Sequence, residues 1–324
     1  MSSGVRTLEA FAMIRLYCAE GGELRTVDSP RLKDALWIDA VAPTPEEVEM
    51  LHKEFDIDLQ DVADCLDPNE RSRVEIEETY DLLVLRSILS EERNGDRIQT
   101  MPIGIFVTKG KVITVRIGSN FTYQELTSEL KHKPRIDVKE DLFLALVRKV
   151  NKDIEKKVRP LERTIASIQE KILTAKRGEV APSAFALSNG LILLNTALLS
   201  NLNAISMLPR AKHLHLTKEK LDIAEDLEND VAQLYEMTTI YREIMSNVLN
   251  AYESTLANSL STVMKTLTTI SLILILPMMI AGWFSMNVAL PFDKDAYWSF
   301  WMVVGVSVAA VAGLWAFFRL KGIL

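Results

Sequence analysis

Two long uncharged runs near the C-terminus constrain the fold more than any other feature of the sequence. No charged residue occurs from Thr266 to Phe292, and none occurs from Ala296 to Phe318. A helix needs about 20 apolar residues to cross the hydrocarbon core of a bilayer, and both runs exceed that length. Aromatic residues at their ends fit interfacial belts. We therefore predict two transmembrane helices, at about residues 263–286 and 296–318, rather than a pair of buried core helices.

Charges beside the two runs predict the orientation in the membrane. Lys265 precedes the first span, and Arg319 and Lys321 follow the second, in a basic tail at residues 319–324. Lysine and arginine are enriched on the cytoplasmic side, so both termini should be cytoplasmic and residues 288–295 should form an external loop. The N-terminal residues show no signal-peptide pattern. We expect a multi-pass protein of the cytoplasmic (inner) membrane, with the lipid bilayer as a partner.

Composition excludes several other classes of protein. With 48% hydrophobic and 25% charged residues, the chain is not a disordered polar sequence. A net charge of -7 argues against nucleic acid as a partner. Cys18 and Cys65 form neither a disulfide framework nor a zinc pattern. No nucleotide-binding, nucleophile–base or metalloprotease motif occurs, so we expect neither an enzyme nor an organic cofactor.

Residues 1–136 have the pattern of an α+β cytoplasmic domain. A threonine cap, a proline and two acidic residues at Thr44–Glu47 begin a helix that extends to about Phe55. A shorter helix is predicted at Leu59–Leu66, and a turn at Thr108–Lys111 suggests a hairpin. The predicted strands are Met13–Ala19, Ala35–Ala40, Tyr80–Ser90, Ile103–Thr108 and Lys111–Ile117.

Residues 137–213 read as paired cytoplasmic helices. Apolar residues keep helical spacing from Asp137 to Lys176, with a kink expected at Pro160. We expect the sequence Arg177–Pro182 to break the helix. Ser183 would then cap a second helix that runs to about Leu208 and ends before Pro209.

Residues 214–287 predict one long stalk helix that continues as the first transmembrane span. Neither glycine nor proline occurs from Leu214 to Leu276. An unbroken helix of that length would extend roughly 95 Å. Two helices with a break near Asn250 remain an alternative. Apolar residues keep one face at spacings of three and four: Leu227, Val231, Leu234, Tyr241, Ile244, Val248 and Tyr252.

A stripe of small, polar and apolar residues follows one face of the first span. Its members recur at alternating spacings of four and three, which keeps them on the same side of a helix. Such a stripe marks either helix–helix contact or the lining of a pore, and its residue types alone do not separate the two. The stripe consists of Met264, Thr268, Ser271, Ile275, Met278, Gly282 and Ser285.

The end of the first span resembles the CorA family of magnesium channels and transporters. The resemblance rests on Ala281–Val288, on Asn258 and Met264–Thr268 before the span, and on Asp61–Leu66 and Arg71–Glu75 in the N-terminal domain. It covers essentially the whole chain. It implies a funnel-shaped homopentamer for magnesium uptake, with the first span lining the pore. The family motif is Gly-Met-Asn, whereas this chain has Ser285 in the glycine position.

The resemblance also implies which residues select, conduct and sense the ion. Ser285, Met286 and Asn287 would form the selectivity filter, where amide oxygens accept hydrogen bonds from the water shell of Mg²⁺. The rest of the stripe would line the pore. Asp64 and Asp226 would bind regulatory Mg²⁺ between neighbouring subunits, so that cytoplasmic magnesium inhibits uptake. Without the resemblance, Asn287 reads as a helix C-terminal residue and the two aspartates read as solvated surface.

Two other functions remain open from the sequence. Another divalent metal, such as cobalt, nickel or zinc, could use the same fold. Histidine and cysteine are the usual ligands of softer metals. Every histidine and cysteine of this chain lies outside the two predicted spans, which favours a hard ion such as magnesium. A membrane-anchored helical scaffold would explain the stalk and the hairpin, but it would not explain Met286 and Asn287 at the helix end.

Overall fold

The structure is a computed structural model. It describes residues 13–20, 23–26, 35–88, 98–118, 126, 136, 138–173, 177–286 and 297–322. The chain divides into two compact units, Met1–Val248 and Leu249–Leu324. The helices that precede the long helix therefore belong to the same unit as the α+β domain.

A mixed seven-stranded sheet forms the centre of the first unit. Its order is β2-β1-β3-β7-β6-β5-β4, and all neighbours are antiparallel except β3 and β7. The predicted hairpin is confirmed, because Val107 pairs with Val112 across the turn. The strands are β1 (Met13–Glu20), β2 (Glu23–Thr26), β3 (Trp37–Val41), β4 (Arg73–Ile76), β5 (Asp81–Ile88), β6 (Thr100–Val107) and β7 (Val112–Arg116).

The five predicted strands are confirmed with small shifts of their ends, whereas β2 and β4 were not predicted. Both are four-residue strands at the two edges of the sheet. β4 alternates charged and apolar residues and is only partly buried, so its sequence carries little of the apolar signal of a central strand.

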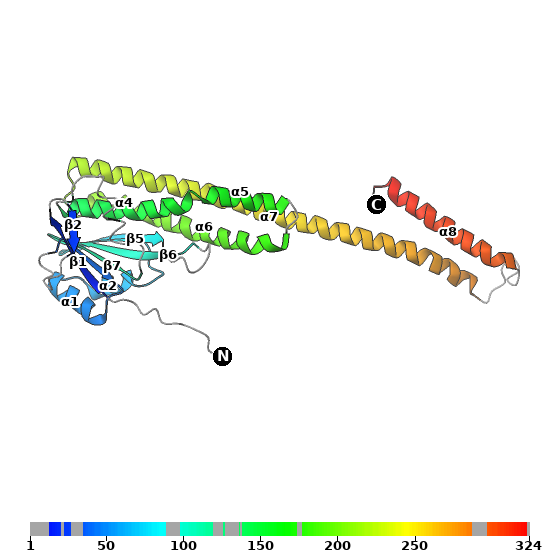
Figure 1. Cartoon of the computed structure of the whole chain (residues 1–324), viewed down its shortest axis with the longest axis horizontal. Helices are drawn as coiled ribbons and strands as arrows, with labels where there is room; N and C mark the ends of the chain where they lie inside the picture. The colour runs from blue at the N-terminus through cyan, green and yellow to red at the C-terminus, as the bar shows by residue number, and fades with distance from the viewer. Residues whose placement is uncertain are drawn as a thin grey trace. The chain divides into compact units, whose positions relative to one another are not determined.

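One face of the sheet is covered by α1 (Pro45–Phe55) and α2 (Leu59–Cys65) (Figure 1). The predicted cap of α1 is confirmed, since Thr44 and Glu47 form a capping box. Helix α2 approaches the sheet closely, because a Cβ added at Gly104 would lie 2.1 Å from Cys65 Sγ. Burial raises the pKa of the Cys65 thiol to about 12, so this thiol is an inert core group.

The other face is covered by α4 (Lys139–Val158) and α6 (Arg177–Ile205), with α5 (Leu161–Leu173) between them in the chain (Figure 1). The expected kink at Pro160 is a complete break between α4 and α5. The expected break at residues 177–182 is wrong, and so is the expected cap at Ser183. Helix α6 includes Pro182 in its second turn, where the proline removes one backbone hydrogen bond but does not end the helix.

The long helix α7 (Lys218–Phe284) is continuous and shows no break near Asn250. It begins at Lys218 rather than at the predicted residue 214. Its first part packs on the helices that cover the sheet. Asn151 Nδ2 of α4 donates a hydrogen bond to the Leu227 carbonyl at 3.3 Å, and Asn195 Nδ2 of α6 donates to Thr238 Oγ1 at 3.1 Å. The predicted apolar face is buried at Leu227, Val231, Leu234, Tyr241 and Val248. The last helix is α8 (Tyr297–Leu320).

Candidate functional site

Three described helices are long and apolar enough to cross a membrane: Ala181–Arg210, Lys218–Phe284 and Tyr297–Leu320. The first of these was not predicted as a span. It packs on β4, β5 and β6 in the first unit, and half of its most apolar window is buried there. Its hydropathy therefore reflects packing on the sheet rather than contact with lipid.

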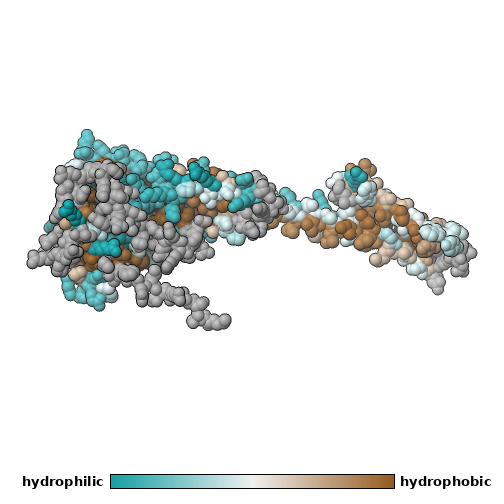
Figure 2. Space-filling model, viewed as in Figure 1, coloured by the Kyte–Doolittle hydropathy of each residue, from teal (hydrophilic) through white to brown (hydrophobic). Residues whose placement is uncertain are grey.

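The second unit exposes nearly all of its apolar surface. Only 11% of the apolar window of α7 and none of that of α8 is buried. Figure 2 shows the hydrophobic colour over the C-terminal part of α7 and over α8. Soluble proteins rarely expose contiguous apolar patches larger than a few hundred Å². The exposed surface therefore requires a lipid bilayer or further protein around it. At the end of α8, Arg319 lies over the Trp315 ring at 5.2 Å, as suits an interfacial anchor.

The predicted stripe on α7 lies on the face that turns away from α8. Thr269 and Ile280 are the buried residues of the membrane part of α7, at 3% and 6% exposure. At about 100° per residue, the stripe lies on the opposite side of the helix. Met264, Ile275 and Met278 are 60%, 52% and 72% exposed. Thr268, Gly282 and Ser285 are exposed as well, and Ser271 is half-buried.

A groove between α7 and α8 confirms which side of α7 faces its neighbour. The groove has a volume of about 730 Å³, and α7 contributes Ile273, Pro277 and Ala281 to its wall. None of the stripe residues lines it. Packing within the hairpin therefore leaves the whole stripe available to other groups.

Helix α7 ends immediately before the predicted filter. The Ser285 amide donates to the Ala281 carbonyl at 2.9 Å, and Ser285 Oγ donates to the Gly282 carbonyl at 2.8 Å. Among described non-glycine residues, only Ala42 and Asp56 have positive φ. Ser285 therefore does not adopt the left-handed conformation that would favour glycine, and serine causes no such strain there. Met286 is exposed, and Asn287 lies outside the described residues.

Asp64 lies on α2 and is already paired within its own chain. Gln60 Nε2 donates to Asp64 Oδ1 at 2.7 Å, and Arg73 Nη2 donates to Asp64 Oδ2 at 3.0 Å. Nearby, the Tyr80 hydroxyl donates to Asp61. Burial raises the pKa of Asp61, and the hydrogen bond from Tyr80 opposes that shift. The pairing of Asp64 with Arg73 was not predicted, because the residues lie on different elements.

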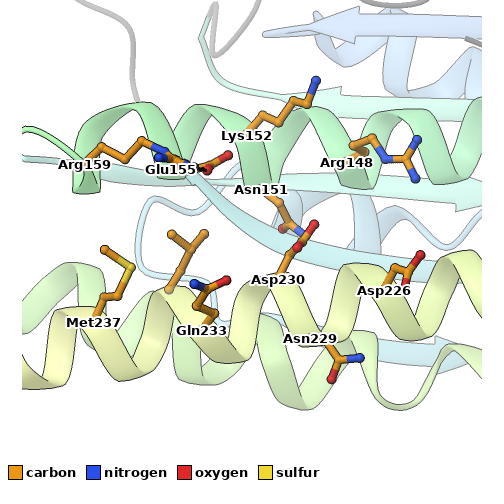
Figure 3. Close-up of a pocket in the computed structure, with 11 residues that line it drawn as sticks. Arg148, Asn151, Lys152, Glu155, Arg159, Asp226, Asn229, Asp230, Gln233 and Met237 are labelled. Carbon is orange, nitrogen blue, oxygen red and sulfur yellow. Dashed lines mark hydrogen bonds and ion pairs between the residues drawn. The ribbon is translucent and has the colours of Figure 1, made fainter.

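Asp226 lies on α7 beside a polar cleft between α4 and α7, with a volume of about 480 Å³ (Figure 3). Acidic residues of α7 face basic residues of α4, including Arg148, across this cleft. In Figure 3, Asn151 points from α4 toward Asp230 of α7. Asn151 is buried, and its Oδ1 has no hydrogen-bond partner among the described residues.

The structure does not bring Asp64 and Asp226 together within one chain. Asp64 belongs to the helices on one face of the sheet, whereas Asp226 lies on α7, which packs on the helices of the other face. The described part of the chain also contains no group of three or more histidine, cysteine, aspartate or glutamate residues able to hold a metal ion. A shared ion at these two residues would therefore require two subunits.

An α+β domain and a helix that continues into a largely exposed apolar hairpin define an integral membrane protein. The chain belongs to the CorA-like Mg2+ transporter protein family, which matches residues 33–320. The resemblance found in the sequence is thereby confirmed. The members of this family transport metal ions across membranes and are not enzymes.

Individual relatives match most of the chain. The cobalt/magnesium transport protein CorA of Methanocaldococcus jannaschii is 28% identical over 295 residues, which cover 89% of this chain and 90% of that protein. The cobalt/magnesium transport protein CorA of Thermotoga maritima is 21% identical over 266 residues, which cover 80% of this chain and 75% of that protein. The complete structure of the CorA magnesium transporter from M. jannaschii matches with a TM-score of 0.81 at 24% identity. The match covers 96% of this chain and 99% of that structure's chain. That structural likeness shows the fold.

Proposed function

We propose that this chain is the subunit of a magnesium channel that takes up Mg²⁺ across the cytoplasmic membrane. The observation that carries the proposal is the uncovered stripe on α7, which turns away from α8 and combines hydroxyl and small residues with methionine and isoleucine. Small and polar residues that share one face of a membrane helix indicate contact with protein or with a water-filled path rather than with lipid. A pore supplies that path.

The proposed pore requires several copies of the chain, because one two-helix hairpin cannot enclose a water-filled path. Five copies would place five stripes around a common axis, with α8 outside them. Rings of Met264, Ile275 and Met278 would form apolar constrictions that gate by losing water. Thr268 and Ser271 would place hydroxyls between them, and Gly282 would let the helices approach closely near the external end.

The proposed filter consists of Ser285, Met286 and Asn287 at the external end of the pore. Mg²⁺ loses its water shell reluctantly and prefers octahedral oxygen ligands. Amide oxygens of Asn287 would accept hydrogen bonds from the bound waters without the strong hold of carboxylates, so that the ion enters and also leaves. The Ser285 hydroxyl, which is bonded to the Gly282 carbonyl, leaves the backbone of the preceding turn helical.

Cobalt is the second candidate ion, because the relatives from M. jannaschii and T. maritima carry both cobalt and magnesium in their names. The spans of this chain contain neither histidine nor cysteine, and this favours magnesium as the main ion. In the proposed orientation both termini are cytoplasmic, and the residues between the spans face the exterior.

Cytoplasmic magnesium is proposed to inhibit uptake by binding between Asp64 of one subunit and Asp226 of the next. Their separation on opposite sides of the sheet within one chain supports a site between subunits. When the ion leaves, the loss of its charge loosens the contact between subunits. The continuous helix α7 then transmits the movement to the stripe.

Mass measurement in a mild detergent tests the proposed pore. We expect a homopentamer of about five times 36.5 kDa after the detergent belt is subtracted. Light scattering combined with refractive-index detection gives this value. A stable monomer or dimer across several mild detergents would contradict a pore built from five stripes, since too few copies would surround the axis.

A further inference from the structure

The guanidinium of Arg73 is shared among four carboxylates. Its Nη2 lies 3.0 Å from Asp64 Oδ2 and 3.7 Å from Asp61 Oδ1, and its Nε lies 2.6 Å from Glu75 Oε1. Its Nη1 contacts the Glu70 carboxylate as well. All five side chains are partly buried, with exposures between 14% and 32%. One edge-strand arginine is therefore the common counter-ion of this acidic cluster.

The charge of the cluster is under-compensated. Four carboxylates and one guanidinium give a formal charge of -3 when all are ionised. Partial burial strengthens these interactions relative to water. An arginine remains protonated at any cytoplasmic pH, so its positive charge is permanent. The cluster is therefore net acidic, and within it Asp64 already accepts a hydrogen bond from Arg73 on one oxygen and from Gln60 on the other.

We propose that Arg73 competes with cytoplasmic Mg²⁺ for Asp64 and thereby sets the magnesium concentration that inhibits the channel. The inference rests on the proposed sensing role of Asp64. A divalent cation that binds Asp64 must share or displace the guanidinium. Arg73 keeps Asp61, Glu70 and Glu75 as partners when it releases Asp64, so the exchange leaves no buried charge unpaired. Competition lowers the affinity for Mg²⁺ to a value that cytoplasmic changes can titrate.

The segment that holds the cluster has a second anchor. Arg86 Nη1 donates to the carbonyls of Pro68 and Glu70 at 2.7 Å each. Asn201 of α6 joins the same region, since its Oδ1 accepts from Ser72 Oγ at 2.6 Å. The link between α2 and β4 therefore stays attached to the sheet without the Arg73 side chain, and Arg73 can be changed with the fold retained.

The test compares Arg73→Gln with the parent in the full-length protein. Mn²⁺ serves as a paramagnetic probe of the site, and Mg²⁺ displaces it. A neighbouring opposite charge shifts the proton affinity of a carboxylate by about one to three pKa units, so the affinity for Mg²⁺ should rise about tenfold or more. Inhibition in liposomes should move to lower internal magnesium by the same factor. Arg73→Lys keeps the positive charge but loses the planar guanidinium with its several donors. Its affinity for Mg²⁺ should lie between those of the parent and Arg73→Gln.

Arg71→Gln is the matched control, because Arg71 is exposed, lies two residues away and changes the net charge equally. Arg71→Gln should change neither the affinity for Mg²⁺ nor the internal magnesium concentration that inhibits uptake. Thermal unfolding checks that each variant is folded. Unchanged or weaker Mg²⁺ binding in folded Arg73→Gln would overturn the competition.

Asp64→Asn separates a failure of this inference from a failure of the sensing role. If Asp64→Asn weakens binding while Arg73→Gln changes nothing, only the competition is wrong. If Asp64→Asn leaves binding and inhibition unchanged, the sensing role fails and the competition fails with it. If the sensing role of Asp64 and the competition by Arg73 are both correct, adding Arg73→Gln to the Asp64→Asn variant should not change Mg²⁺ binding further.

Discussion

Replacing Asn287 with alanine is expected to abolish selective magnesium uptake while the oligomer stays intact. A hydrogen bond that involves a charged group contributes about 1.5–3 kcal/mol. The loss of two such bonds to the hydrated ion would reduce the flux by at least about a hundredfold, and a ring of amides would lose more. Packing should change little, because the substitution follows the end of α7 at Phe284. Magnesium flux into liposomes and the mass in detergent are the two measurements.

Ser285→Gly is the companion variant, since it restores the family residue one turn after Ala281. The serine backbone is not left-handed, so glycine is not needed there for its conformation, and transport should be retained. Loss of transport in Ser285→Gly would instead make the Ser285 hydroxyl a working part of the filter. Flux at the parental rate in Asn287→Ala would remove Asn287 from the filter altogether.

The double variant Asp64→Asn, Asp226→Asn is expected to weaken inhibition by internal magnesium without altering ion selectivity. The proposed bridge needs both carboxylates, and an amide pair holds a hydrated dication far less strongly than a carboxylate pair. To move the population from 99% open to 99% closed, ion binding must favour the closed state by about 5.5 kcal/mol. A loss of about 1.4 kcal/mol of binding already raises the inhibitory concentration tenfold, and the loss of both carboxylates should exceed it. Flux against internal magnesium at millimolar levels measures it.

Asp222→Asn is the control for this experiment. Asp222 is exposed on α7 one turn before Asp226, so its substitution removes a similar charge without touching the proposed bridge. Internal magnesium should inhibit uptake by Asp222→Asn at the same concentration as in the parent. If the double variant closes at the same internal magnesium as the parent, the two carboxylates are not the sensor and belong to an ordinary solvated surface.

Local signals made much of the fold predictable from the sequence. The capping box at Thr44, the turn after Thr108 and the two apolar runs depend on neighbouring residues, and the structure contains each of them. The long helix follows from the absence of glycine and proline between Leu214 and Leu276, and it continues through Pro277 to Phe284. The predicted start of α6 is wrong, because the sequence Arg177–Pro182 has the residues of a helix break although it forms the first turns of α6.

Contacts between distant segments could not be predicted. Nothing in the sequence near Gly104 indicates that Cys65 of α2 lies against it. The pairing of Arg73 with Asp64 depends on how α2 and the edge strand β4 meet in space. The spacing of the stripe on α7 was visible, but its orientation away from α8 required the packing of the hairpin.

Magnesium uptake by the full-length protein in liposomes tests whether the chain transports magnesium at all. A magnesium-sensitive dye inside the vesicles would report entry, with cobalt, nickel and zinc added outside as competitors. The account predicts saturable uptake above that of empty vesicles, stronger for magnesium than for nickel or zinc, and suppressed by magnesium loaded inside. Uptake equal to that of empty vesicles, with the protein correctly assembled, would contradict it.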